Sequence, residues 1–454
     1  MIDRTVVSQD SQAAPASLAQ AGLASTAVEA LIARYGETGY MRDLRLAAWD
    51  AYQRIPMPSN RDEEWRRTDI RPLDLDAFQP VPEPDGRDED SSALRATLAS
   101  DDALAGLLVQ RNGAEWSRSL DAGLAAKGVI FGTLDAVALE HPDLIAEYLA
   151  RVVPADDDKF VALATAFRSG GAFLYVPRNV TVELPLRGVT WGDQAGLAIC
   201  PRTVIVAETG ADVTYIDDYA SRGLANPSTG QGFSASVVEI VASPGSRVRY
   251  IGLQEWDPSV WSFATNRAMV DADATVNSLV VALGGRLSKA RVQTHLRGRG
   301  ASAEMLGVLF GTGRQHFDHH TTQEHIAPNT TSDLLYKAVL KDSSRSVFSG
   351  MIRAHKNAQK TDAVQTNRNL LLSSKSRADS IPNLEILAND LRCTHAAAIA
   401  PVDEEQLFYL QARGLARPDA VRLIVEGFFE PLLERIPLPG IRERLRASIE
   451  ARIG

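Results

Sequence analysis

The residues best suited to carry chemistry are Cys393 and His395, which lie in the stretch LRCTHAAAIA. The apolar character of this stretch predicts a β-strand, and positions i and i+2 of a strand point to the same side. A thiolate and an imidazole on one face form half of a site for iron or an iron–sulfur cluster, which normally takes four ligands. The alternative is an inert buried cysteine beside a hydrogen-bonded histidine, which the flanking segments LEIL and AAAIA favour.

A second cluster of polar side chains lies in RQHFDHHTTQEHIAP. On a strand, His316, Asp318 and His320 share one face, and the residues between them take the other. Imidazole and carboxylate groups at this density are compatible with a divalent metal site. The candidate metal ligands are His316, Asp318, His320 and His325. The competing interpretation is a stack of polar strands in which each side chain hydrogen-bonds to its neighbours.

Composition argues against several classes of function. The net charge of −9 and the pI of about 5.5 disfavour binding to nucleic acid or to an anionic membrane. No GxxxxGK[ST] motif occurs, so a Walker-type ATPase is not expected. No apolar run approaches the ~18 residues of a membrane span, and the first residues lack a secretory signal pattern. Two cysteines without disulfide or zinc spacing predict a cytoplasmic protein.

The elements that position these residues are predicted by changes of pattern along the chain. The N-terminal part is helical or mixed, with an acidic linker near 79–93 and an amphipathic helix at 141–153. Short strands rich in Val, Ile, Tyr and Thr follow, with apolar residues at alternate positions. Three helices close the chain, the first with Asp403 as its N-cap. The predicted regions are 1–165, 166–402 and 403–454.

Turn sequences in the strand-rich region recur roughly every 27–35 residues, as in ETGADV, SPGSRV, DADATV and GRGASA. Repeats of this length built from short strands are typical of a solenoid or a propeller, and no Trp-Asp blade signature is present. We therefore predict a mostly β fold, a right-handed parallel β-helix with helical regions at both ends. A β-sandwich is the alternative.

The C-terminal helices carry apolar side chains that either cap the solenoid or dock a partner, because solenoid ends need covering. These candidate docking residues are Leu407, Phe408, Phe428 and Phe429.

Several long segments resemble the SufB/SufD family of the SUF iron–sulfur cluster assembly machinery. They include AQKTDAVQTNRNLLLS, PNLEILANDLRCTH, DEEQLFYLQARG, RQHFDHHTTQEHIAP and, near the N-terminus, PSNRDEEWRRTD. The chain is most similar to SufD, because residues 365–373 lack the cysteine of SufB and Ala396 replaces the Glu that SufB tends to have after the histidine. It departs from the typical Cys-Ser-His-Gly-Ala-Thr by reading Cys-Thr-His-Ala-Ala-Ala.

The resemblance implies a non-catalytic scaffold subunit that pairs with SufB through the ends of the β-helices. The C-terminal helices would dock the ATPase SufC, which would hydrolyse ATP while this chain binds no nucleotide. Cys393 and His395 would handle iron or a transient iron–sulfur cluster shared with SufB. A homodimer in the absence of SufB is compatible with the family.

Two other functions stay open. One is a purely structural brace for SufB, in which Cys393 and His395 are inert packing residues. The other is a carbohydrate-active β-helix enzyme, against which the missing secretory signal and the missing row of aromatic sugar platforms argue.

Overall fold

The computed structural model describes residues 22–80, 94, 98 and 103–453. The predicted acidic linker at 79–93 therefore lies outside the described residues after Pro80.

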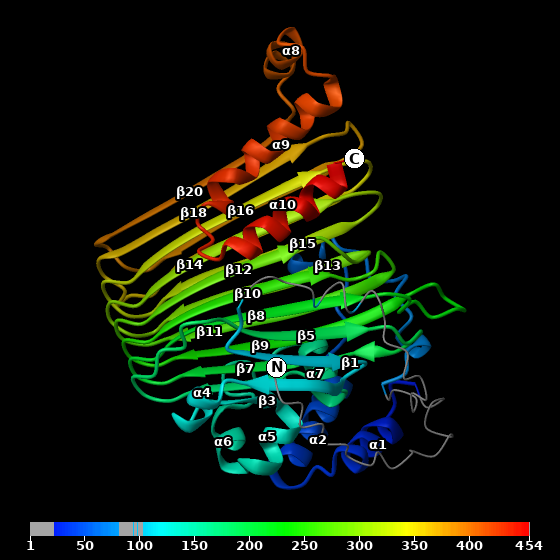
Figure 1. Ribbon diagram of the computed structural model, residues 1–454, viewed down its shortest axis with the longest axis vertical. Helices are drawn as coiled ribbons and strands as arrows, with labels where there is room; N and C mark the ends of the chain where they lie inside the picture. The colour runs from blue at the N-terminus through cyan, green and yellow to red at the C-terminus, as the bar shows by residue number, and fades with distance from the viewer. Residues whose placement is uncertain (1–21, 81–93, 95–97, 99–102, 454) are drawn as a thin grey trace.

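Two sheets face each other and form a parallel β-solenoid of about 8 turns (Figure 1). The first sheet contains β1 (Gly106–Arg111), β2 (Ala114–Leu120), β5 (Leu186–Gly192), β8 (Asp212–Ser221), β10 (Arg247–Glu255), β12 (Thr275–Ala282), β14 (Ser302–Gly311), β16 (Thr331–Leu340), β18 (Thr361–Leu371) and β20 (Leu391–Pro401). The second sheet contains β3 (Ile130–Thr133), β4 (Ala172–Val176), β6 (Ala198–Ile199), β7 (Arg202–Ala207), β9 (Gly232–Ala242), β11 (Val260–Val270), β13 (Leu287–Leu296), β15 (His316–His325), β17 (Arg345–Ala354) and β19 (Arg377–Ile386).

From β7 onward, successive strands alternate between the two sheets, and each strand up to β18 pairs in parallel with the strand two places further along the chain. This topology confirms the solenoid and excludes the β-sandwich, whose sheets are antiparallel. The chain stays in register from turn to turn, so that Val248 aligns with Val276, and Val276 with Ala303. These aligned residues are all buried and fill the space between the sheets.

The N-terminal region covers the first end of the solenoid (Figure 1). Its helices are α1 (Ser25–Tyr35), α2 (Gly39–Arg54), α4 (Ala122–Ala126), α5 (Leu134–Glu140), α6 (Pro142–Tyr148) and α7 (Lys159–Ala166), with short 3-10 helices at Glu63–Trp65 and Leu75–Ala77. The strands β1 and β3 precede residue 166 yet already pair with β5 and β4 of the two sheets.

Helix α6 ends at Tyr148, whereas the sequence predicts helix to residue 153. Ala150 adopts a left-handed conformation with φ of 59°. The carboxylate of Glu239 on β9 accepts hydrogen bonds from the backbone N–H groups of Ala150, Val152 and Val153. A carboxylate remote in the sequence thus satisfies donors that would otherwise extend the helix.

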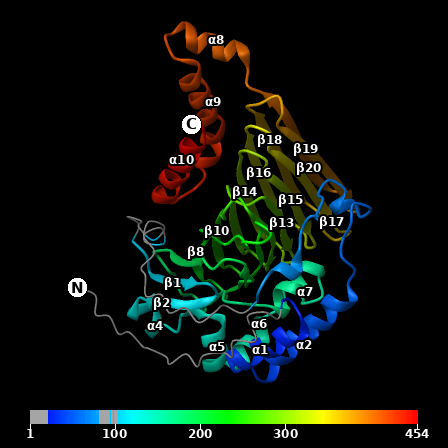
Figure 2. The ribbon, with the colours of Figure 1, turned by 90° about the vertical axis from the view of Figure 1, so that its right-hand side faces the viewer.

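The C-terminal region contains α8 (Glu404–Ala412), α9 (Arg417–Leu433) and α10 (Pro439–Ile453). Asp403 caps α8 as predicted, because its side chain accepts hydrogen bonds from the backbone N–H groups of Glu405 and Gln406. Apolar residues of α9 and α10 pack against the outer face of the first sheet, whereas α8 stands beyond the end of the solenoid (Figure 2). No described helix has the length and apolar character needed to span a membrane.

Candidate functional site

Cys393 and His395 lie on β20, the last strand of the first sheet, and no further strand pairs with its outer edge among the described residues. They align with Ala363 and Gln365 of β18, which are buried inside the solenoid. Side chains of aligned residues in a parallel sheet point to the same face. Cys393 and His395 therefore share one face, as predicted, and that face looks toward the interior at the open end of the solenoid.

The open end changes the environment of both side chains. Because no further turn covers β20, His395 is exposed and Cys393 is half-buried. Cys393 is a free cysteine, and burial, assisted by the negative charge of Asp362, raises the pKa of its thiol. The thiol is therefore protonated at neutral pH, and a bound metal ion would have to displace its proton.

Apolar side chains surround this end of the solenoid. Leu384 and Ile386 of β19, Leu387 after it and Ile399 of β20 are exposed, with Leu387 at 56%. Exposed apolar side chains that gather at one place mark an interaction surface. The two candidate ligands thus lie at the edge of a surface suited to a protein partner.

The predicted histidine cluster divides between the two faces of β15. On the outer face, Asp318 binds Lys289 at 2.7 Å and His320 at 2.9 Å, and accepts a hydrogen bond from Thr68. Burial alone would raise the pKa of Asp318, but the hydrogen bond from His320 and the charge of Lys289 outweigh it and hold that pKa well below its usual range. His316 lies 3.2 Å from the Thr68 hydroxyl.

His325 cannot join this group, because it lies on the inner face of β15. Its two ring nitrogens are 2.8 Å from the hydroxyls of Thr330 and Ser332. In the part of the chain that the structure describes, no three His, Cys, Asp or Glu side chains are placed to hold a metal ion. Metal binding by His316, Asp318, His320 and His325 stays a prediction, without a formed set of ligands to support it.

Sequence reasoning missed Lys289 and Thr68, the partners of Asp318. The signal for Lys289 was the length of one solenoid turn, because Lys289 aligns with Asp318 on the neighbouring strand. The same signal would have found Gln365, which aligns with His395. Thr68 reaches the sheet from the N-terminal region, and no local pattern indicates that contact.

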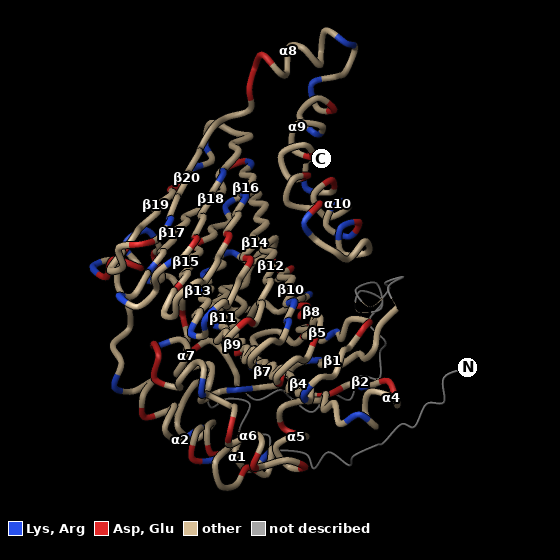
Figure 3. Tube along the Cα trace, turned by 90° about the vertical axis from the view of Figure 1, so that its left-hand side faces the viewer, with Lys and Arg blue, Asp and Glu red and all other residues tan. Residues whose placement is uncertain are grey.

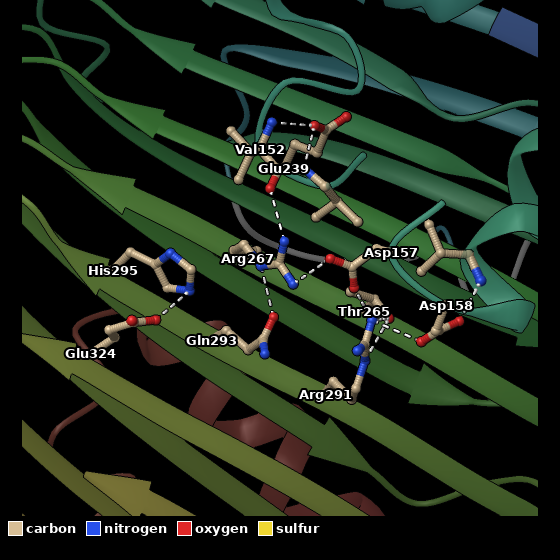
Figure 4. Close-up of polar contacts among 12 residues, drawn as sticks. Val152, Asp157, Asp158, Glu239, Thr265, Arg267, Arg291, Gln293, His295 and Glu324 are labelled. Carbon is tan, nitrogen blue, oxygen red and sulfur yellow. Dashed lines mark hydrogen bonds and ion pairs between the residues drawn. The ribbon is translucent and has the colours of Figure 1, made fainter. Parts of the chain in front are cut away.

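A polar cavity of about 600 Å³ lies beside this cluster, over the outer face of the second sheet. Two arginines of the cavity form ion pairs with the loop after α6 (Figure 4). Arg267 lies 2.9 Å from Asp157, and Arg291 lies 2.7 Å from Asp158. The described residues that line the cavity include no Phe, Tyr or Trp. Basic and acidic residues are interspersed along the solenoid in the view of Figure 3.

The predicted docking residues of the C-terminal helices differ in exposure, and docking itself stays a prediction. Phe408 is 74% exposed, whereas Leu407 and Phe429 are buried within the protein. Phe428 is partly buried, with its ring 5.4 Å from that of Phe429 and 5.1 Å from Lys337 Nζ. The burial of Leu407 and Phe429 fits packing within the protein. The exposed large apolar side chains of this region are Phe408, Tyr409, Leu415 and Leu423.

The buried histidines predict a pH dependence of stability. Burial lowers the pKa of His325 to about 4, from about 6.5 in the unfolded chain. Between these values the unfolded state binds more protons, so the free energy of unfolding falls as the pH is lowered. We expect His325→Gln to reduce the slope of unfolding free energy against pH by about one proton. Urea titrations from pH 7 to 4 measure this slope, and an unchanged slope would contradict the assignment.

Comparison with known proteins identifies the family. Residues 190–428 match the SUF system FeS cluster assembly, SufBD core domain, and residues 26–187 match the SufBD protein N-terminal region. An iron-sulfur cluster assembly SufBD family protein of Staphylococcus epidermidis is 30% identical over 92% of this chain and 90% of its own length. The iron-sulfur cluster assembly protein SufB of Bacillus subtilis is 29% identical, with the same shares covered.

These matches extend over both the helical N-terminal region and the solenoid that carries Cys393 and His395. The chain belongs to the SufB/SufD family of the SUF iron–sulfur cluster assembly system.

Proposed function

We propose that this chain is a SufD-like scaffold subunit that pairs with a SufB homologue through its open solenoid end and docks a SufC ATPase through α8 and the start of α9. ATP hydrolysis takes place on SufC, and this chain is not itself an enzyme. The observation that carries the proposal is the position of Cys393 and His395, which point inward on a terminal strand beside exposed apolar side chains. Two ligands form only half of a cluster site, so the partner supplies the rest.

The choice of SufD over SufB rests on two features of the sequence. Residues 365–373 contain no cysteine, and Ala396 follows His395. The name of the Bacillus subtilis relative applies to that protein, and at 29% identity it does not decide the role of this chain.

In the proposed mechanism, ATP binding draws two SufC subunits together and moves the C-terminal helices. Lys337 of β16 donates a hydrogen bond to the carbonyl oxygen of Phe428 in α9, at 2.6 Å, which couples that helix to the solenoid. The movement shifts the interface with SufB and exposes Cys393 and His395 to iron and sulfide. His395 would hold the metal through a ring nitrogen, and Cys393 would bind it as a thiolate after losing its proton to solvent.

A second function, a structural brace for SufB, has one observation in its favour. The raised pKa and half-burial of Cys393 are typical of an inert packing residue rather than of a reactive thiol. In that case His395 and Cys393 would be dispensable while the complex stays intact.

Co-purification tests the scaffold role. We expect the tagged chain, expressed with the SufB and SufC of its own organism, to recover all three proteins. Anaerobic reconstitution with iron and sulfide should then produce the visible absorption of an iron–sulfur cluster. Recovery of this chain as a colourless monomer or homodimer would contradict the proposal.

A further inference from the structure

Gln365 lies on β18 next to His395 and is only 1% exposed. Neither its Nε2 nor its Oε1 atom has a hydrogen-bond partner among the described residues. Buried amides almost always find partners, because leaving the group unpaired costs free energy. An unpaired carboxamide beside a candidate iron ligand therefore calls for a functional explanation.

The opposite sheet leaves space for the amide of Gln365. A Cβ atom added at Gly350 of β17 would lie 2.4 Å from both Gln365 Nε2 and Oε1. Glycine at 350 therefore makes room for the amide between the two sheets. An apolar side chain of the same size would fit this space without an unsatisfied polar group, so packing alone does not account for glutamine here.

Other unpaired polar atoms lie in the same turns of the solenoid. Thr321 Oγ1 and Gln323 Oε1 of β15 and Ser380 Oγ of β19 are buried without a partner in the described chain. The first turns enclose a mostly apolar core, although Tyr215 Oη also lacks a partner there among the described residues. Unpaired polar atoms therefore lie inside the solenoid near the end that carries Cys393 and His395, as a hydrated or ligand-bearing site requires.

We propose that Gln365 is a positioning residue for the iron site, an inference that rests on the proposed function. Its backbone lies one strand away from that of His395, about 4.8 Å along the ladder, and both side chains point to the same face. Nε2–H donates a hydrogen bond to a sulfide or thiolate on the iron, and Oε1 accepts one from an iron-bound water. Groups that hold the ligands of a metal are commonly as necessary as the ligands themselves.

The experiment uses the intact complex with SufB and SufC and compares Gln365→Leu with Asn369→Leu. Asn369 is a matched control, because it lies on the same face of β18 with an unpaired Oδ1 but aligns with Ile399. Both variants replace a buried amide with an apolar group. Gln365→Leu should keep or raise the urea midpoint of this chain, whereas Asn369→Leu also removes the hydrogen bond to Asn367 Oδ1 and should lower it. Only Gln365→Leu should weaken iron binding, by about tenfold or more.

Cobalt(II) supplies a readout that a merely structural role would not change. Bound through Cys393, it gives a thiolate-to-metal absorption band whose position reports the ligands around the ion. We expect Gln365→Leu to shift or lose this band and Asn369→Leu to retain it. His395→Ala, included as a third variant, should also weaken iron binding by about tenfold or more.

The outcomes separate the two proposals. Wild-type iron binding and cobalt spectrum in Gln365→Leu, with loss in His395→Ala, would overturn the role of Gln365 and leave the proposed function standing. If the wild-type complex binds no iron, or if neither Gln365→Leu nor His395→Ala changes iron binding, the role of Gln365 and the proposed function would both be overturned. If neither Gln365→Leu nor the more flexible Gln365→Met assembles, the amide has a structural partner, and the inference fails.

Discussion

Replacing Glu239 by alanine is expected to lower the free energy of unfolding by about 3–5 kcal/mol, the usual cost of breaking a buried ion pair. The Glu239 carboxylate is fully buried and lies 2.8 Å from Arg202 Nη2, which is also buried. It accepts hydrogen bonds of 2.9 Å from the N–H groups of both Val152 and Val153, two of its three backbone donors after α6. Alanine would leave the Arg202 charge and all three donors unpaired.

The loop held by Glu239 also carries Asp157, which pairs with Arg267 and Arg291 at the polar cavity (Figure 4). Glu239→Ala should therefore also loosen the ion pairs that Asp157 forms at the cavity. Urea denaturation measures the change, with Glu385→Ala as the control, since Glu385 forms an exposed pair with Arg353. Exposed pairs contribute about 1 kcal/mol or less. A change for Glu239→Ala as small as that of the control would contradict the prediction.

Replacing His395 by alanine is expected to reduce cluster accumulation on the reconstituted complex by about tenfold or more. The reason is that His395 is exposed on the terminal strand and provides one of only two metal-binding side chains on this face. The measurement is iron per complex together with visible absorption after anaerobic reconstitution.

Thr394→Ala is the matched control, because Thr394 lies on the same strand with its side chain on the opposite face. Its effect should be small. Stoichiometric recovery of SufB and SufC must be shown for both variants, so that loss of the cluster is not loss of the complex. An intact His395→Ala complex with a normal cluster would favour the structural brace.

The sequence predicts what depends on local pattern. Alternation of residue type placed His316 and Asp318 on one face of β15, and the Asp403 cap marked the start of α8. Turn spacing predicted a parallel solenoid, and the segments around Cys393 and His395 resembled the SufB/SufD family.

What the sequence could not predict depends on contacts between distant segments. Helix α6 ends where Glu239 accepts hydrogen bonds from the backbone, and the sequence of the helix does not predict this contact. The burial of Leu407 and Phe429 depends on how the C-terminal helices pack, and their apolar character alone cannot distinguish packing from docking. The sequence does not predict that the amide of Gln365 is unpaired, because a buried glutamine ordinarily has a hydrogen-bond partner.

The open end of the solenoid has a consequence for aggregation. A solenoid whose last strands are uncovered presents unpaired backbone groups, which can template the addition of further copies into a fibre. Pro382 lies within β19 and has no backbone N–H, and proline is tolerated in a strand where its nitrogen faces away from the paired neighbour. Arg377, Asp379 and Glu385 add charges along the same strand. The open end of the solenoid can therefore bind one partner while it resists the addition of further copies of this chain.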